Sequence, residues 1–331
     1  MKQSLLIDKY GRQLNYLRLS VTDRCNFRCY YCMPEEGINF APRKELMTFD
    51  EMLLLSTTFC NLGISKIRIT GGEPFVRNGI MPFLKKLSVI EGLNEITVTS
   101  NGTLSAKYQA ELLQMGIRKI NISLDSLSRE RFEHITRRDT FDSVYAGIFK
   151  LLDNGFEVKL NCVVAENKNI QDIVPFIELT KNHSLSVRFL EEMPFNGSDG
   201  SQVQSDWDYK RIYGHIEQYY PEINRLISDA NSTSVNYKIS GYKGSFGIIP
   251  SFSRTFCGTC NRIRLSATGE LRTCLYGPPV INLRDLLRKG ASLADLEQAI
   301  LHAVSQRERN GYAAEVASKG AIHTSMSVLG G

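Results

Sequence analysis

The strongest constraint on the fold is a regular alternation of short strand-like and longer helix-like segments between residues 14 and 191. This alternation is typical of βα units, in which each helix leads the chain back to start the next strand of a parallel sheet. The predicted strands are residues 15–21, 66–70, 95–99, 119–124, 157–164 and 186–190, and the predicted helices are 49–61, 80–90, 105–115, 141–154 and 170–181. Six units are too few to close a barrel of eight. The pattern therefore predicts an α/β protein with a partial, six-unit barrel.

The alternation stops near Glu192, and Gly, Ser, Asp and Asn crowd residues 196–206, a composition typical of a connection. We therefore expect two regions. Residues 1–195 form the partial barrel, and residues 196–331 form a C-terminal extension that closes it. The extension carries three cysteines, a helix-like stretch at 285–307 and a terminal Gly330-Gly331 pair.

Charged and apolar side chains alternate along the predicted strands. Successive side chains of a strand point to opposite faces, and helices cover the apolar face of a parallel sheet, so the polar face is expected to line the barrel interior. Its cations are Arg18, Lys66, Arg68, Lys159 and Arg188. An unpaired buried charge is costly, so this set predicts an anionic ligand in the interior. Structural pairing of some of these cations with Asp or Glu is the alternative.

Six of the eight cysteines form two widely separated triads, Cys25-x3-Cys29-x2-Cys32 and Cys257-x2-Cys260-x13-Cys274. The other two, Cys60 and Cys162, lie in or beside apolar segments and are expected in the core. An iron–sulfur cubane normally takes four cysteine ligands, so the first triad could hold three corners and leave one iron open to a small molecule. Zinc is the alternative, but a structural zinc site needs four ligands. No histidine or fourth cysteine lies nearby in the sequence.

The second triad is followed by Arg262 and Arg264, which alternate with Ile263 and Leu265 and so share one face of a predicted strand. Arginine suits phosphate and purine recognition because its guanidinium presents a rigid fork of donors. A second cluster or a zinc ribbon with one further ligand would each explain these three cysteines.

Three runs of sequence resemble the GTP 3′,8-cyclase family of radical S-adenosylmethionine (SAM) enzymes. They are LRLSVTDRCNFRC at residues 17–29, KIRITGGEP at 66–74 and FCGTCNRIRLS at 256–266. The terminal Gly330-Gly331 is similar too. The resemblance spans almost the whole chain and is weakest at residues 196–242.

The resemblance implies two [4Fe–4S] clusters, one that binds SAM and one that binds the purine of GTP. It implies that a 5′-deoxyadenosyl radical abstracts the C3′ hydrogen of the GTP ribose and that the C3′ radical attacks guanine C8. The product is (8S)-3′,8-cyclo-7,8-dihydroguanosine 5′-triphosphate, made in the first step of molybdenum cofactor biosynthesis. The resemblance also implies an electron donor, which supplies electrons to the reaction, and a separate synthase, which converts the product to cyclic pyranopterin monophosphate.

The resemblance also implies roles for individual residues. Cys25, Cys29 and Cys32 would hold the SAM cluster, and Cys257, Cys260 and Cys274 the second cluster. The SAM contacts would be Tyr31, Gly72, Ser123 and Met193. The GTP contacts would be Arg18, Lys66, Arg68, Thr99, Lys159, Arg188, Arg262 and Arg264. The catalytic set would be Arg18, Arg68, Arg262, Arg264, Gly330 and Gly331. In addition, the acceptor-rich segment 121–125 is expected near the ribose hydroxyls of SAM.

Charge and hydropathy limit the classes of partner that this chain is expected to bind. The formal net charge of +5 is too small to indicate nucleic acid. No apolar run is long enough to span a bilayer, and the N-terminus does not resemble a signal peptide, so we expect a cytoplasmic monomer or homodimer with no membrane contact. The competing interpretations are a radical SAM maturase that modifies a peptide, which would need more C-terminal cysteines, and a zinc-binding interaction module.

Overall fold

The computed structural model describes residues 5–195, 206–318 and 325–330. Its strands are β1 Tyr16–Ser20, β2 Lys66–Thr70, β3 Glu95–Ser100, β4 Lys119–Ser123, β5 Glu157–Val164, β6 Ser186–Glu191, β7 Ile223–Arg225, β8 Val235–Ile239, β9 Ser245–Ile249, β10 Arg262–Leu265, β11 Glu270–Arg272 and β12 Ile281–Asn282. Its helices are α1 Phe49–Asn61, α2 Ile80–Leu87, α3 Gln109–Gln114, α4 Arg129–Thr136, α5 Phe141–Asp153, α6 Ile173–Asn182, α7 Tyr209–Glu217, α8 Leu283–Arg288, α9 Leu293–Ser305, α10 Gly311–Ala317 and α11 Met326–Leu329. None of the described helices is long and apolar enough to cross a membrane.

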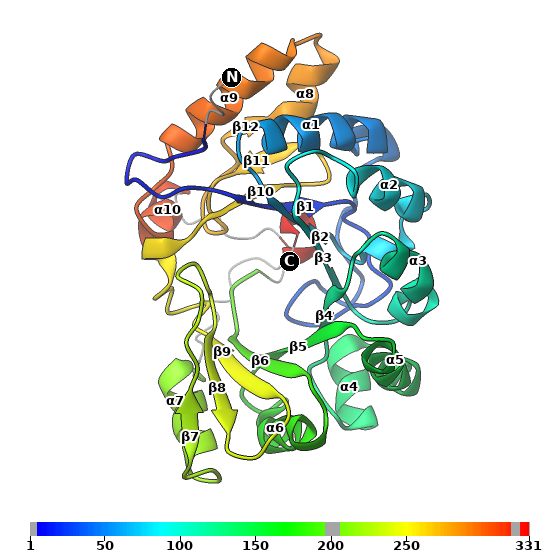
Figure 1. The fold of residues 1–331 in the computed structure, drawn as a ribbon, viewed down its shortest axis with the longest axis vertical. Coiled ribbons are helices and arrows are strands. Elements are labelled where there is room, and N and C mark those ends of the chain that lie inside the picture. The colour runs from blue at the N-terminus through cyan, green and yellow to red at the C-terminus, as the bar shows by residue number, and fades with distance from the viewer. Residues whose placement is uncertain (1–4, 196–205, 319–324, 331) are drawn as a thin grey trace.

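The strands form one curved sheet in the order β12-β11-β10-β1-β2-β3-β4-β5-β6-β9-β8-β7. Strands β1 to β6 are parallel neighbours, with helices α1 to α6 on the convex side (Figure 1). The sheet ends at β12 and β7 without joining them, so the barrel is open. This confirms the predicted α/β partial barrel of six units. The C-terminal region was expected to close the barrel, and this part of the prediction is wrong, because its described strands extend the sheet at both edges without pairing β12 with β7.

The C-terminal region extends the sheet at both edges. Strand β10 pairs parallel with β1, and β9 pairs parallel with β6. Beyond them, β11 and β12 on one side and β8 and β7 on the other continue as antiparallel strands. The alternation of Arg262 with Ile263 indicated β10. Nothing in the local pattern indicated that β9 and β10 would flank the six-strand core.

Four helical segments differ from the prediction, one of them at 170–181, where a 3₁₀ turn over 170–172 precedes α6. Helix α4 was not predicted, because its sequence RERFEHIT is mostly charged; Ser128 caps it by accepting a hydrogen bond from Arg131 N. The predicted helix at 105–115 is a 3₁₀ turn followed by α3. The stretch 285–307 holds two helices, α8 and α9, which Gly290 separates in the left-handed conformation with φ of 86°.

The two faces of the sheet divide as the alternation predicted. Leu17, Leu19 and Ile67 are fully buried under the helices, while the polar side chains of the same strands face the inside of the curve. Cys60 and Cys162 are buried in the same core, at 2% and 0% exposure. The fold therefore leaves a polar interior at the centre of the sheet, and the short helix α11 lies within it (Figure 1).

Candidate functional site

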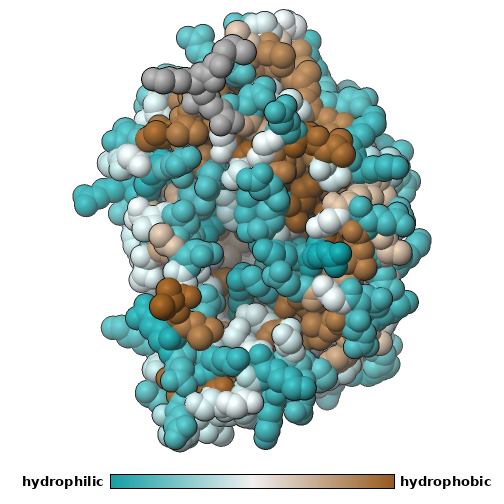
Figure 2. All heavy atoms as spheres, viewed as in Figure 1, coloured by the Kyte–Doolittle hydropathy of each residue, from teal (hydrophilic) through white to brown (hydrophobic). Residues whose placement is uncertain are grey.

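A cavity of about 700 Å³ occupies the interior of the curved sheet. Figure 2 shows it as a hollow at the centre of this face, bordered mainly by hydrophilic residues. Its walls come from strands β1 to β6 and from the C-terminal region. Its size falls within the range of small-molecule sites.

The structure brings most of the predicted site residues to this cavity. All eight predicted GTP contacts line it, namely Arg18, Lys66, Arg68, Thr99, Lys159, Arg188, Arg262 and Arg264. Cys257, Cys260 and Cys274 line it as well, together with the predicted SAM contacts Tyr31, Ser123 and Met193. Gly72 and the first cysteine triad are not among the lining residues. Gly330 contacts Arg264, and Gly331 lies outside the described residues.

Three guanidiniums are neighbours across three strands. In the register of the sheet, Arg18 on β1 lies beside Arg68 on β2 and Arg264 on β10. Burial lowers the pKa of Arg264 to about 10, and burial together with Arg68 lowers that of Arg188 to about 10. Such a cluster of buried like charges is unfavourable unless an anion offsets it. We call Arg18, Lys66, Arg68, Lys159, Arg188, Arg262 and Arg264 the basic wall.

The two explanations of the basic wall, an anionic ligand and pairing within the protein, concern different residues. Lys66 Nζ pairs with Glu95 Oε1 at 2.6 Å, so its charge is offset within the protein. In the described part of the chain, neither Arg68, Lys159 nor Arg188 pairs with a carboxylate. The Nε atoms of Arg68 and Arg188 are buried without a hydrogen-bond partner there. Burial, then Arg188 and Arg68, lower the pKa of Lys159 to about 8. These groups are available to an anionic ligand.

Tyr16 belongs to the site although its side chain was not predicted as a functional one. It lies on β1, on the same face as Arg18, and Lys66 Nζ sits 5.0 Å from the centre of its ring. Burial by itself raises the pKa of Tyr16, but four neighbouring cations outweigh burial and lower that pKa to about 8. They are Arg68, Arg18, Lys66 and Arg262. The strand alternation that predicted Arg18 on the inner face also predicts Tyr16 there, because the two residues are two positions apart on one strand.

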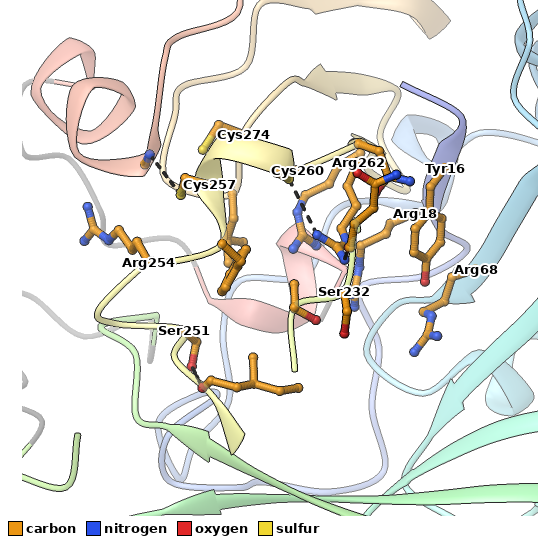
Figure 3. A pocket seen from close by; sticks show the side chains of 18 of the residues that line it. Tyr16, Arg18, Arg68, Ser232, Ser251, Arg254, Cys257, Cys260, Arg262 and Cys274 are labelled. Atoms are coloured by element: carbon orange, nitrogen blue, oxygen red, sulfur yellow. Dashed lines mark hydrogen bonds between the residues drawn. The ribbon is translucent and has the colours of Figure 1, made fainter. Parts of the chain in front are cut away.

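The second cysteine triad lies on one side of the cavity, with Tyr16, Arg18 and Arg68 on the other (Figure 3). Arg262 Nη1 donates to Cys260 Sγ at 3.6 Å, and Gly311 N donates to Cys257 Sγ at 3.4 Å. Burial alone raises the pKa of the Cys260 thiol, but Arg307 and Arg262 outweigh burial and lower it to about 7. Thiolate character of this kind suits a metal ligand.

Arg12 is a second residue that sequence reasoning missed. It lies in an N-terminal hairpin, where its Nε donates to Asp8 Oδ2 at 2.6 Å. Its Nη1 donates to Cys257 O at 3.0 Å and its Nη2 to Glu308 O at 2.7 Å. Arg12 thereby ties the segment that carries Cys257 to the segment around Glu308. No local pattern marks it, because its partners lie about 245 and 296 residues away in the chain.

The first cysteine triad lies in the loop that follows β1. Cys25 Sγ accepts from Phe27 N at 3.3 Å and from Asn101 Nδ2 at 3.8 Å. Cys29 O accepts from Cys32 N at 2.9 Å, which turns the loop back on itself. Burial raises the pKa of Cys25 to about 12 and that of Cys32 to about 11, and the charges of Cys25 and Cys32 add to the raised pKa of Cys29. The three cysteines thus come from one eight-residue loop, and burial is the main cause of the raised pKa at each thiol.

The Gly71-Gly72-Glu73 segment supports this loop from the next strand. Gly72 N donates to Thr22 O and Glu73 N donates to Arg24 O, each at 2.8 Å. A Cβ atom at Gly72 would lie 2.3 Å from Arg24 O, so only glycine fits there. The carboxylate of Glu73 is fully buried and accepts from Asn101 N at 2.6 Å. The motif therefore fixes the backbone directly before Cys25.

Both triads offer three free thiols from short segments, the donor type that iron–sulfur clusters use. No three His, Cys, Asp or Glu side chains in the described ranges are arranged to hold a single metal ion. A cubane spreads its ligands over separate iron corners, so it does not require its thiolates to converge on one point. By the chemistry of their donors, both triads fit a cluster with one open iron.

Comparison with known proteins shows which class of protein carries such a fold and such cysteines. Residues 19–180 match the model of the radical SAM superfamily, and residues 185–313 match the model described as Molybdenum Cofactor Synthesis C. Among solved structures, native anSMEcpe with bound AdoMet shares the fold, with a TM-score of 0.61 at 14% identity over 95% of this chain and 88% of that chain. The open barrel and the cysteine loop after its first strand thus define a radical SAM protein.

Two relatives narrow the family. The chain is 40% identical over 311 residues to GTP 3′,8-cyclase of Peptoclostridium acidaminophilum, covering 93% of both proteins. It is 42% identical over 307 residues to Molybdenum cofactor biosynthesis protein 1 of Bos taurus, covering 92% of this chain and 48% of that protein. The chain thus spans about half the length of that relative. It belongs to the GTP 3′,8-cyclase family, and SAM and an iron–sulfur cluster are its cofactors.

Proposed function

We propose that this chain is a GTP 3′,8-cyclase, a lyase that forms (8S)-3′,8-cyclo-7,8-dihydroguanosine 5′-triphosphate from GTP in the first step of molybdenum cofactor biosynthesis. The observation that carries the proposal is that one cavity unites the basic wall with the second cysteine triad. The negative charge of the GTP triphosphate would offset the positive charge of the basic wall. A nitrogen atom of the guanine would bind the open iron of a cluster held by the second triad. The name of the bacterial relative, which the chain matches along 93% of its length, supports the same reaction.

The basic wall would bind the triphosphate and ribose of GTP. Arg68, Lys159 and Arg188 would meet the phosphates, because they have no carboxylate partner in the described structure. Guanidinium groups donate in pairs to phosphate oxygens and hold the ligand in one orientation. Lys66 would exchange Glu95 for a phosphate, and Thr99, which already accepts from Arg68 Nη1 at 3.4 Å, would complete the contact.

Cys25, Cys29 and Cys32 would hold the cluster that binds SAM, with Tyr31, Gly72, Ser123 and Met193 as SAM contacts. When bound and reduced, these cofactors would supply the radical chemistry that removes hydrogen from ribose C3′ and allows C3′ to bond to guanine C8. The electron donor would supply the further electron that, with a proton, completes the 7,8-dihydro product. The protein's part is to hold the C3′ hydrogen close to the radical and to exclude water.

Cys257, Cys260 and Cys274 would hold a second cluster whose open iron binds guanine. Arg18, Arg68, Arg262 and Arg264, with Gly330 and Gly331, would lie around the reacting nucleotide. We further propose that the boundary between the barrel and the region carrying this cluster falls at residues 195–196. An electron donor and a downstream cyclic pyranopterin monophosphate synthase would be the protein partners.

Isotope transfer tests this reaction. Reconstituted protein is incubated anaerobically with SAM, a reductant and GTP that carries deuterium at ribose C3′, and 5′-deoxyadenosine is analysed by mass spectrometry. The proposal predicts one deuterium in 5′-deoxyadenosine with C3′-labelled GTP and none with C2′-labelled GTP. Unlabelled 5′-deoxyadenosine in both samples would overturn it.

A further inference from the structure

Asp125, two residues beyond strand β4, is held by hydrogen bonds from two other parts of the chain. Its Oδ2 accepts from Tyr31 Oη at 2.8 Å, and its Oδ1 accepts from Val163 N at 2.8 Å. The residue is 3% exposed. The segment 121–125 was expected to meet the ribose hydroxyls of SAM. Each carboxylate oxygen of Asp125 thus accepts one hydrogen bond within the protein, and the expected contact with the ribose stays a prediction.

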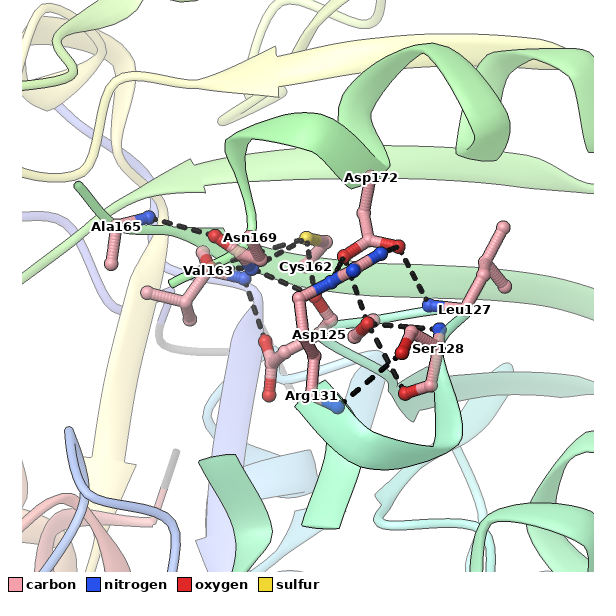
Figure 4. A network of polar contacts seen from close by, with 10 residues as sticks. Asp125, Leu127, Ser128, Arg131, Cys162, Val163, Ala165, Asn169 and Asp172 are labelled. Atoms are coloured by element: carbon pink, nitrogen blue, oxygen red, sulfur yellow. Dashed lines mark hydrogen bonds and ion pairs between the residues drawn. The ribbon is translucent and has the colours of Figure 1, made fainter. Parts of the chain in front are cut away.

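A second set of contacts fixes the backbone of this segment (Figure 4). Asn169 Nδ2 donates to Asp125 O at 2.7 Å and to Val163 O at 2.8 Å. Asp172, which is 1% exposed, accepts from Leu127 N at 3.1 Å and pairs with Arg131 through two nitrogen atoms. The loop after β4 is thus anchored to the region before α6, and a buried, fully bonded carboxylate of this kind has little freedom to move.

Tyr31 lies between two residues of the first triad, Cys29 and Cys32. Its hydroxyl is bonded to Asp125, while Cys32 follows it directly and Cys29 precedes it by two residues. The Tyr31–Asp125 bond therefore connects the anchored loop after β4 to the cysteine loop after β1. Of the side-chain hydrogen bonds described for Cys29, Tyr31 and Cys32, this is the bond to the loop after β4.

We propose that Asp125 is a positioning residue that holds the Cys29–Cys32 turn in place through the hydroxyl of Tyr31. The turn then presents its thiols in one arrangement before any cluster is bound. This inference rests on the proposed function only where it concerns the effect of Asp125 on SAM binding. The arrangement of the thiols can be measured without SAM, GTP or a cluster.

The first test uses the full-length protein without a cluster and the Tyr31→Phe variant, which removes the bond and leaves the charge of Asp125. Alkylation of each cysteine by iodoacetamide is followed by mass spectrometry of peptides. We expect Cys29 and Cys32 to react about threefold to tenfold faster in the variant, the range expected for loss of one hydrogen bond to a charged group. The rate at Cys257 should not change. Unchanged rates at Cys29 and Cys32, or an equal rise at Cys257, would overturn the proposal.

The second test measures SAM and GTP binding by the reconstituted holoenzyme. Asp125→Leu, which removes both acceptors, should weaken SAM binding about tenfold and leave GTP binding unchanged. Asp125→Asn keeps an acceptor for Val163 N and an amide that can bond Tyr31 Oη, so it should restore most of the SAM affinity. A control for the loss of a carboxylate that accepts from a tyrosine is Glu178→Leu, since Glu178 Oε1 accepts from Tyr220 Oη at 2.6 Å away from the cysteine loop.

Equal weakening of SAM and GTP binding by Asp125→Leu, or the same loss in Glu178→Leu, would contradict a positioning role. Failure of the cyclisation reaction itself would leave the alkylation result intact, so the two proposals fail separately.

Discussion

Arg264 Nη1 donates to the carbonyl oxygen of Gly330 at 2.9 Å, which ties the C-terminal segment to strand β10 beside the second cysteine triad. At the other end of the same segment, Ser325 Oγ donates to Cys32 O at 2.6 Å. Leu329 packs between these two points in a small cluster with Phe195 and Tyr276. The segment 325–330 therefore contacts both cysteine sites at once, although they are more than 220 residues apart in the sequence.

Loss of the Arg264 bond should loosen this segment. In Arg264→Ala we expect hydrogen exchange at the amides of residues 326–330 to be about fivefold faster, because one charge-assisted hydrogen bond is lost. The matched control is Arg272→Ala, since Arg272 Nη1 donates to Gly277 O at 2.8 Å and does not touch the segment. The same acceleration in both variants would contradict a specific tether.

Gly72 should tolerate no side chain. In Gly72→Ala the new methyl group would lie 2.3 Å from Arg24 O, and the backbone before Cys25 would have to shift. We expect a loss of about 2 kcal/mol or more in the free energy of unfolding, with reduced iron incorporation. Gly214→Ala is the control: it lies inside α7 with no atom within 4 Å of the new Cβ, and should stabilise the protein by about 0.5 kcal/mol. Similar melting temperatures for the two variants would refute the packing argument.

GTP affinity should fall as pH rises from 7 to 9. Lys159, with a pKa of about 8, loses its positive charge in this window, and Tyr16, also with a pKa of about 8, gains a negative one. Bound phosphate raises both pKa values, so GTP binding takes up protons. Deprotonation of Lys159 and deprotonation of Tyr16 therefore each weaken the binding of an anionic ligand. Binding calorimetry should show a loss of about tenfold or more for the unmodified protein.

Substitution separates the two groups. Lys159→Arg stays charged and Tyr16→Phe cannot ionise, so each variant should lose part of the pH dependence and the double variant most of it. An unchanged pH profile in the double variant would show that neither group faces the ligand.

Arg262 should contribute to GTP binding and not to SAM binding. Its two terminal nitrogens bond Cys260 Sγ and Asn231 O, so the guanidinium is held at the cavity wall beside the second triad. In Arg262→Ala we expect GTP affinity to fall about tenfold to a hundredfold, while cleavage of SAM to 5′-deoxyadenosine persists. Arg225→Ala, an exposed position on β7, serves as the control. Unchanged GTP affinity in Arg262→Ala would remove this residue from the site.

The sequence predicted the parts of the structure that depend on local periodicity. The strand alternation placed Arg18, Arg68 and Lys159 on the inner face, because a period of two leaves a side chain only two directions. The same rule buried Leu17 and Ile67 under the helices. The family was confirmed by its relatives, while the roles of the single residues stay predictions.

Contacts between distant segments could not be predicted in this way. The pairing of Lys66 with Glu95 crosses two strands and depends on their register. Arg12 meets Cys257 because β1, which follows the N-terminal hairpin, pairs with β10, which follows Cys257. Asp125 follows β4 as expected, but the direction of its carboxylate is set by Val163 and Tyr31, which come from two other parts of the chain.

The most direct test of the account is an anaerobic single-turnover assay with reconstituted protein, SAM, a reductant and GTP, with products identified by mass spectrometry. We expect 5′-deoxyadenosine together with a cyclised isomer of GTP, and the loss of both in Cys25→Ala. Formation of 5′-deoxyadenosine without consumption of GTP would contradict the assigned substrate. The absence of both products from protein with intact clusters would contradict the radical reaction itself.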